Sequence, residues 1–179
     1  MVIPVTPTVC SRSPEALLSF TTNTATSLLP CSKKAARLVQ SKMNPKHLPP
    51  LNEFIATVFK RSRLPPCVCL VSLIYLQRLK TSLPRHARGD VDTPYRLFLA
   101  AILTASKFLS ETGSSLTSQA IADMVNYVYT PKDVNLMERS FLGLIKYDLF
   151  VNVESIKDYL AIYGKILEMD LVEDDVMDS

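Results

Sequence analysis

The positions of proline constrain the fold of this chain more than any other feature of the sequence. Proline is tolerated in the first turn of a helix but costs about 3 kcal/mol in a helix interior. Only four glycines occur in the 179 residues, whereas prolines are spread along the chain after residue 48, at positions 49, 50, 65, 66, 84, 94 and 131. Each stretch between these prolines is therefore predicted to be a helix.

The apolar spacing within the stretches supports this prediction. Apolar side chains recur three and four positions apart, as on one face of an amphipathic helix, over residues 51–59, 121–128, 134–145 and 156–167. Residues 67–83 are apolar nearly all round, and residues 93–110 carry two apolar faces. A helix that is apolar on most sides is surrounded by other helices. We predict an all-α fold, with a five-helix bundle around a central third helix, residues 93–110, and a further C-terminal helix.

Two threonine–proline pairs are predicted to begin helices. Thr93-Pro94 and Thr130-Pro131 each place threonine at the N-cap and proline at the first helical position, where the missing N–H of proline costs nothing. Asp133 falls in the first turn of its helix, where the helix dipole favours an anion. The threonine side chains are expected to stabilise these two helix starts.

The two ends of the chain differ in composition from its middle. Residues 1–32 contain five Ser, six Thr and four Pro, a composition that does not offset the entropy of ordering, so they are predicted to be disordered. Residues 33–47 are expected to form a basic lead-in, with a short helix as one option. The folded domain is predicted to span residues 48–165. Residues 166–179 are predicted to be an acidic tail, because six acids and no base follow Leu167.

The positive charge is concentrated in one third of the chain. Residues 33–88 hold twelve Lys and Arg against one acid, Glu53. Such a face suits nucleic acid, an acidic partner or plain solvation. The aromatic residues of this stretch, Phe54, Phe59 and Tyr75, fit the apolar stripes of helices rather than an exposed stacking surface. Nucleic-acid binding is therefore the weaker interpretation.

No catalytic, metal or cofactor arrangement is visible in the sequence. His47 and His86 lie among loop-like residues without a carboxylate nearby in sequence. Cys67 and Cys69 are two positions apart, which on a helix is a rotation of about 200°, so they cannot bind one metal ion together. No glycine precedes position 89, which excludes a glycine-rich phosphate loop upstream of it. We expect no enzyme, no metal and no cofactor.

Membrane insertion and disulfide formation are not expected either. The longest apolar run, Cys67 to Leu76, is broken by Ser72 and is far too short to span a bilayer. No secretory signal precedes the four cysteines, which we interpret as reduced intracellular thiols.

Three segments of the chain resemble the cyclin box. Thr93–Leu109 is similar to the central helix of the box, and Val71–Leu79 is similar to the helix before it. Val134–Leu142, followed by Lys146-Tyr-Asp-Leu149, resembles the matching segment of single-box fungal cyclins related to the phosphate-signalling cyclins, especially their G1-type branch. The resemblance covers about residues 48–163. It departs from the family at Tyr147, where the family usually has tryptophan.

The resemblance implies the regulatory subunit of a cyclin-dependent protein kinase of the phosphate-signalling type. Such a protein is expected in cell-cycle or nutrient signalling, in the nucleus and the cytoplasm, with the kinase substrates as further partners. Lys107 stands where cyclins place the lysine that binds kinase backbone near the kinase C-helix, and Glu138 stands where they place its glutamate partner. Phe108 and Leu142 would be apolar contacts for that helix. ATP and magnesium would belong to the kinase.

Alternatives to these roles remain open at the level of sequence. Lys107 interrupts an otherwise apolar helix, and a buried charge is costly unless it is paired. Two other arrangements meet this requirement: Lys107 and Glu138 pair only with each other, or Lys107 extends to water. Phe108 and Leu142 would equally suit ordinary core packing. The alternative function is a cyclin-like helical transcription factor or nucleic-acid-binding module without a kinase partner.

Overall fold

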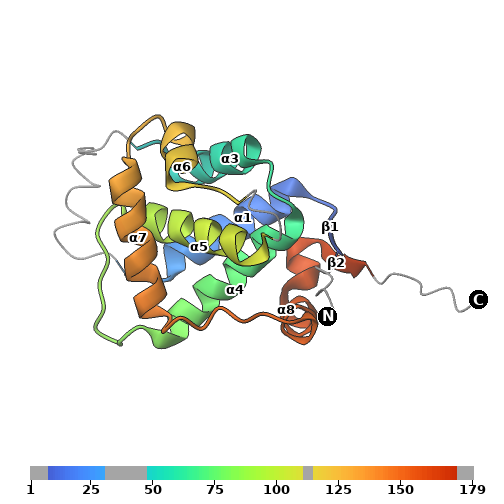
Figure 1. The fold of residues 1–179 in the computed structure, drawn as a ribbon. Helices are drawn as coiled ribbons and strands as arrows, with labels where there is room; N and C mark the ends of the chain where they lie inside the picture. Colours follow the sequence, from blue (N-terminus) through green and yellow to red (C-terminus); the bar gives the residue numbers. More distant parts are fainter. Residues whose placement is uncertain (1–7, 31–47, 111–114, 173–179) are drawn as a thin grey trace, which may run out of the picture.

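The structure is a computed structural model, and it describes residues 8–30, 48–110 and 115–172. Seven helices and two short strands form in this part of the chain (Figure 1). The helices are α1 (Pro14–Ser27), α3 (Leu51–Ser62), α4 (Pro66–Ser82), α5 (Thr93–Leu109), α6 (Ser118–Met124), α7 (Pro131–Leu144) and α8 (Val153–Leu167), and the strands are β1 (Thr8–Ser11) and β2 (Met169–Val172).

Helix α5 is the centre of the bundle, as predicted. It packs against α1, α3, α4 and α7, and every residue from Phe98 to Ser106 is buried. Figure 1 shows α5 across the middle of the molecule, with α3 and α6 above it, α4 below it and α7 across one end. The apolar residues on most sides of α5 thus contact neighbouring helices rather than water, and the all-α prediction is confirmed.

Most of the predicted helix starts agree with the structure. Helix α4 begins at Pro66 and α7 at Pro131. At the start of α7, the Thr130 hydroxyl accepts the Asp133 N–H at 3.2 Å, and the Asp133 carboxylate accepts the Thr130 N–H at 2.9 Å. These two bonds form a reciprocal capping box, which satisfies backbone donors that no helical carbonyl can reach.

The N-cap prediction for Thr93 is wrong by one residue. Asp92 occupies the N-cap position of α5, and Thr93 is already helical. The Thr93 hydroxyl instead accepts the Asp90 N–H at 2.7 Å, so it stabilises the turn that precedes the helix. A side chain that can bond backward or forward cannot be assigned from its position beside a proline alone.

The predicted disorder of residues 1–32 is wrong for residues 8–30. Ser13 caps α1 by accepting the Ala16 N–H at 3.2 Å, and Leu17, Thr21 and Ala25 form its buried stripe. The Thr21 hydroxyl donates to the Leu17 carbonyl at 2.7 Å within the same helix. Thr22 and Thr26 donate within the helix in the same way, so a helix of polar composition packs against α3, α4, α5 and α8.

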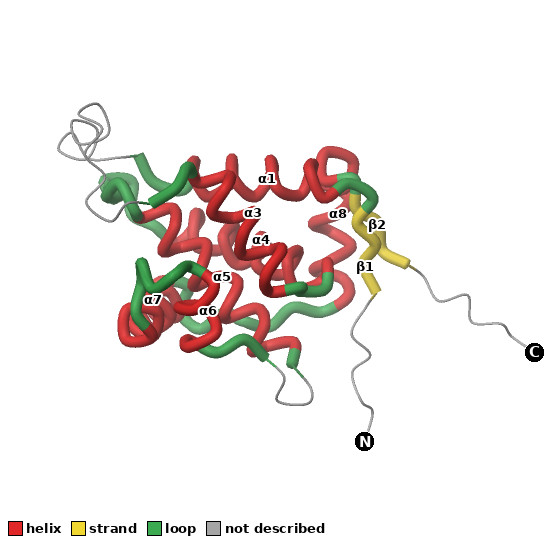
Figure 2. The backbone as a smooth tube through the Cα atoms, turned by 90° about the horizontal axis from the view of Figure 1, so that it is seen from above, coloured by secondary structure: helices red, strands yellow, loops and turns green. Residues whose placement is uncertain are grey.

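The two strands form an antiparallel ribbon that the sequence did not predict. Thr8 pairs with Val172 and Ser11 with Met169, and the pairing continues with the Arg12 N–H donating to the Glu168 carbonyl at 2.9 Å. Part of the predicted acidic tail is therefore ordered as β2. Figure 2 shows the ribbon at one edge of the helical bundle. The predicted basic lead-in at residues 33–47 lies outside the residues that the structure describes.

Candidate functional site

An ion pair joins the central helix to α7. Lys107 Nζ lies 3.0 Å from Oε1 and 2.8 Å from Oε2 of Glu138. Lys107 stands in the last turn of α5, and Glu138 stands near the middle of α7. The side chain of Lys107 is 45% exposed and that of Glu138 is 17% exposed. The structure therefore brings together the two charged residues that the resemblance singled out.

The burial of this pair differs from the expectation for Lys107. The buried part of α5 ends at Ser106, and Lys107 lies just beyond it, so its ammonium is not enclosed. A cation in the last turn of a helix is also favoured by the carbonyls there. The less exposed partner is Glu138, whose Oε2 is buried and is compensated by the ammonium 2.8 Å away. The carboxylate, more than the lysine, needs the pair.

The two predicted apolar contacts flank the ion pair. Phe108 follows Lys107 and is 39% exposed, and its ring contacts the ring of Tyr75 edge-on at a centroid distance of 6.4 Å. Leu142 lies one turn after Glu138 on α7 and is half-buried. Core packing does not account for Phe108, since more than a third of it faces solvent. Leu142 is divided between the core and the surface.

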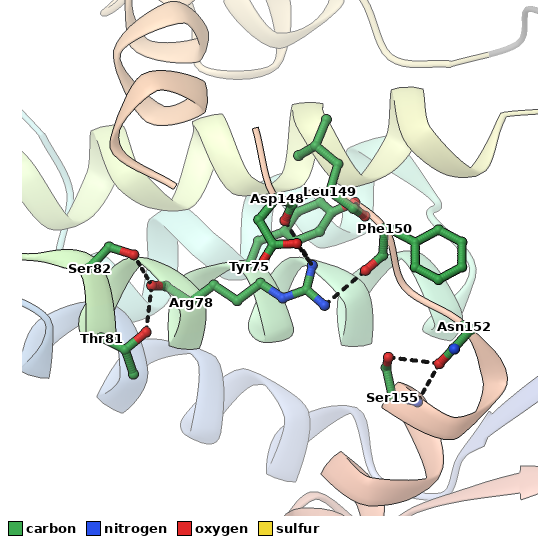
Figure 3. Close-up of polar contacts among 9 residues, drawn as sticks. All are labelled: Tyr75, Arg78, Thr81, Ser82, Asp148, Leu149, Phe150, Asn152 and Ser155. Carbon is green, nitrogen blue, oxygen red and sulfur yellow. Dashed lines mark hydrogen bonds and ion pairs between the residues drawn. The ribbon is translucent and has the colours of Figure 1, made fainter. Parts of the chain in front are cut away.

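A second group of residues lies in the connection from α7 to α8, where the sequence analysis singled out only Tyr147 and missed the others. Tyr147 and Phe150 are 67% and 69% exposed, and two residues of α4 hold the backbone between them (Figure 3). Arg78 donates to the carbonyls of Asp148 and Phe150 at 2.8 and 2.9 Å. Two signals in the sequence pointed this way: residues 146–149 resemble the matching cyclin segment, and the charged Arg78 ends the apolar part of its helix.

Tyr75 completes this group from the interior of the bundle. Its ring is fully buried, and its hydroxyl donates to the Leu149 carbonyl at 2.8 Å. Burial raises the pKa of Tyr75 above the usual range for a phenol, so the hydroxyl keeps the proton that it donates. The Arg78 guanidinium lies 5.9 Å from the centre of the Tyr75 ring, in the arrangement of a cation–π contact.

The His, Cys, Asp and Glu residues in the described part of the chain do not gather into a metal site. No group of three His, Cys, Asp or Glu residues within them could hold a metal ion. Cys67 and Cys69 are buried, and burial raises the pKa of the Cys67 thiol to about 11. His86 is exposed, and His47 lies outside the described part. None of the described helices is long and apolar enough to cross a membrane.

The aromatic residues of the basic stretch lie where a nucleic acid cannot stack on them. Phe54 and Tyr75 are buried, and Phe59 packs against the core in edge contact with Phe98. The prediction that these rings belong to the core is confirmed. A stacking surface for single-stranded nucleic acid would need such rings in the open.

Comparison with known proteins agrees with this architecture. The family described as "Cyclin, N-terminal domain" matches residues 18–150 of the chain. The match begins within α1, thirty residues before the predicted start of the domain at residue 48. It thus includes most of the helix that composition alone had assigned to a disordered tail.

Three curated relatives come from Saccharomyces cerevisiae. PHO85 cyclin-1 is 32% identical over 143 residues, which are 78% of this chain and 50% of the relative. PHO85 cyclin-2 is 26% identical over 117 residues, which are 65% of this chain and 37% of the relative. PHO85 cyclin-9 is 26% identical over 121 residues, which are 67% of this chain and 39% of the relative. The chain spans half the length of these relatives or less.

Proposed function

The chain belongs to the cyclin family, and from this membership we propose that it is the activating regulatory subunit of a cyclin-dependent protein kinase. The observation that carries the proposal is the Lys107–Glu138 ion pair, half-open to solvent beside an exposed aromatic ring. A purely structural ion pair would have no need of Phe108 in the open next to it. Aromatic residues are enriched at protein interfaces.

The pair has bonding capacity left for a partner. A lysine ammonium carries three donors, and Lys107 directs its contacts in the structure toward the Glu138 carboxylate. Its exposed side can donate to a backbone carbonyl of a docked helix, while the carboxylate can accept from a donor on that helix. Phe108 and Leu142 would then cover the apolar side of the helix. We assign these four residues to docking of the kinase C-helix.

The mechanism that follows is positional. A kinase is active only when a lysine–glutamate pair of its own is in place, and the glutamate belongs to the C-helix. Docking that holds the C-helix in its active position therefore raises the rate of phosphoryl transfer. In this proposal the kinase supplies ATP binding, magnesium and every catalytic group, and this chain supplies none.

The kinase partner that we propose is of the type named in the relatives. All three curated relatives carry the name of PHO85. The proposal includes the substrates of that kinase as further partners and a location in both nucleus and cytoplasm, which a fluorescent fusion of the chain would test. The alternative of a nucleic-acid-binding module is not favoured, because the rings of the basic stretch are packed in the core.

Reconstitution tests the proposal directly. The purified chain is mixed with purified PHO85 of Saccharomyces cerevisiae, and the two are followed by size-exclusion chromatography and by phosphorylation of a protein substrate. We expect one complex and a phosphorylation rate at least tenfold above that of PHO85 alone. Failure of the folded chain to bind PHO85, at micromolar concentrations of both, would overturn the proposed partner.

A further inference from the structure

Three consecutive backbone carbonyls after α7 accept hydrogen bonds from two side chains of α4. Arg78 bonds the carbonyls of Asp148 and Phe150, and Tyr75 bonds the carbonyl of Leu149 between them (Figure 3). The Arg78 guanidinium also lies 3.7 Å from the Asp148 carboxylate. The planar fork of arginine suits two acceptors at once, which a lysine ammonium cannot match in geometry. Each carbonyl of the segment thus has its own donor.

The chain enters this segment in an unfavourable conformation. Lys146 and Tyr147 both lie in the left-handed region, with φ of 56° and 55°. The left-handed region is disfavoured for residues with a side chain, and two such residues in succession persist only where the surroundings hold them. Part of that hold comes from the Tyr147 N–H, which donates to the Leu142 carbonyl at 2.9 Å. The bonds from α4 hold the residues that follow.

Two aromatic rings at this segment are exposed rather than buried. Tyr147 immediately precedes the segment and Phe150 ends it, and each is about two thirds exposed. In Figure 3 the Phe150 ring stands on the side of its backbone away from the Arg78 guanidinium. Tyr75 links the segment to the ion-pair site, because its hydroxyl bonds Leu149 while its ring contacts Phe108. The exposed rings therefore adjoin the docking residues through one buried tyrosine.

We propose that Arg78 and Tyr75 are positioning residues for kinase docking, which fix residues 148–150 so that Tyr147 and Phe150 extend the apolar docking surface beyond Phe108. This inference rests on the proposed function. Neither Arg78 nor Tyr75 needs to touch the kinase. Their effect reaches the partner through Phe150, whose backbone they hold and whose ring meets the apolar face of the docked helix.

Two conservative substitutions test the hydrogen bonds from α4 to residues 148–150. Arg78→Lys keeps the charge and loses the bidentate fork, and Tyr75→Phe keeps the ring contact with Phe108 and loses the bond to Leu149. We expect each variant to bind PHO85 about tenfold more weakly, as measured by titration of fluorescently labelled chain, and to exchange the amide protons of residues 148–151 faster than wild type. Circular dichroism and melting curves establish that each variant is folded, and the two substitutions serve as independent tests if one of them fails to fold.

The chain offers a matched control at the other end of α7. Arg61 of α3 bonds the end of α6 in the same manner, since it donates to the Met124 carbonyl at 2.9 Å. The left-handed residues Asn126 and Tyr127 come shortly after that carbonyl in the chain. Figure 1 places the end of α6 near the start of α7, away from residues 147–150. Arg61→Lys is expected to lower the melting temperature about as much as Arg78→Lys does and to leave PHO85 binding within twofold of wild type.

A double-mutant cycle separates positioning from general destabilisation. Phe150→Ala alone should weaken binding about tenfold. If Arg78 acts through Phe150, the double variant Arg78→Lys/Phe150→Ala should bind little more weakly than either single variant, because the ring that Arg78 positions is already absent. Independent effects would multiply to about a hundredfold. The inference would be overturned if the two losses of affinity multiplied in the double variant. It would also be overturned if folded Arg78→Lys and folded Tyr75→Phe both bound PHO85 as wild type does. Wild-type chain that fails to bind PHO85 would overturn the proposed function itself, before any variant is compared.

Discussion

Reversing the charge of Glu138 tests whether its pair with Lys107 serves docking or only joins α5 to α7. Glu138→Lys brings two ammonium groups to about 4 Å, where they repel by about 4 kcal/mol at an effective dielectric constant of about 20. Lys107 is 45% exposed, so its flexible side chain can move into water and relieve most of this repulsion. We therefore expect a loss of stability of about 1 kcal/mol, the scale of partly exposed ion pairs. The isolated chain should stay folded and melt about 2–4 °C lower.

The expected effect on the kinase is larger than the effect on the fold. Docking covers the pair, and truncation or reversal of one partner of a buried, hydrogen-bonded charge pair costs about 2–5 kcal/mol. Since about 1.4 kcal/mol is tenfold in affinity, PHO85 binding should fall at least tenfold. The assay is titration of PHO85 with labelled chain, together with the phosphorylation rate at saturation. Glu53→Lys on α3 is the matched control, because it changes the net charge equally at an exposed site on another helix.

The charge-swapped variant Lys107→Glu/Glu138→Lys decides between the two roles. The swap restores an ion pair between α5 and α7, so the melting temperature should return to within about 1 °C of wild type. The kinase would still meet an acceptor where it needs a donor, and a donor where it needs an acceptor. Binding should therefore stay at least tenfold weaker than wild type. If the swapped chain binds and activates PHO85 as wild type does, the docking role of the pair is refuted and only its internal role remains.

Three further predictions concern the fold. Thr130→Ala removes the capping box of α7 and should cost about 1 kcal/mol in urea unfolding, and an unchanged unfolding midpoint would contradict the cap. Leu17→Ala should cost about 2–5 kcal/mol, because Leu17 belongs to the buried stripe of α1, whereas a truly disordered segment would tolerate it without change in melting. Burial raises the pKa of Cys67 to about 11 from 9.0, so the folded chain holds a proton that the unfolded chain loses, and stability should fall as pH rises from about 9 toward 11. Buried Cys69, whose pKa is raised to about 12, acts in the same direction, and equal free energies of unfolding at pH 8 and pH 10.5 would argue against both shifts.

Local chemistry was enough to predict most helices of the bundle. A proline at a helix start and a threonine before it act within one turn, so Pro66, Thr130 and Pro131 were assigned correctly from sequence neighbours. The two apolar faces of residues 93–110 likewise required neighbours on most sides, which α5 has. Lys107 and Glu138 were identified from the resemblance of their helices to a cyclin box, and their helices bring them into contact.

Features that depend on contacts between distant segments needed the tertiary structure. Helix α1 has the composition of a disordered segment, and it is ordered because other helices cover its stripe while its hydroxyls bond within the helix. The β1–β2 ribbon pairs Thr8 with Val172, and neither four-residue strand is stable without the other. The hydrogen bond from Arg78 to the Phe150 carbonyl joins residues 72 positions apart in the chain. Packing decides which distant polar group a side chain bonds, because sequence patterns report only neighbours within a few turns.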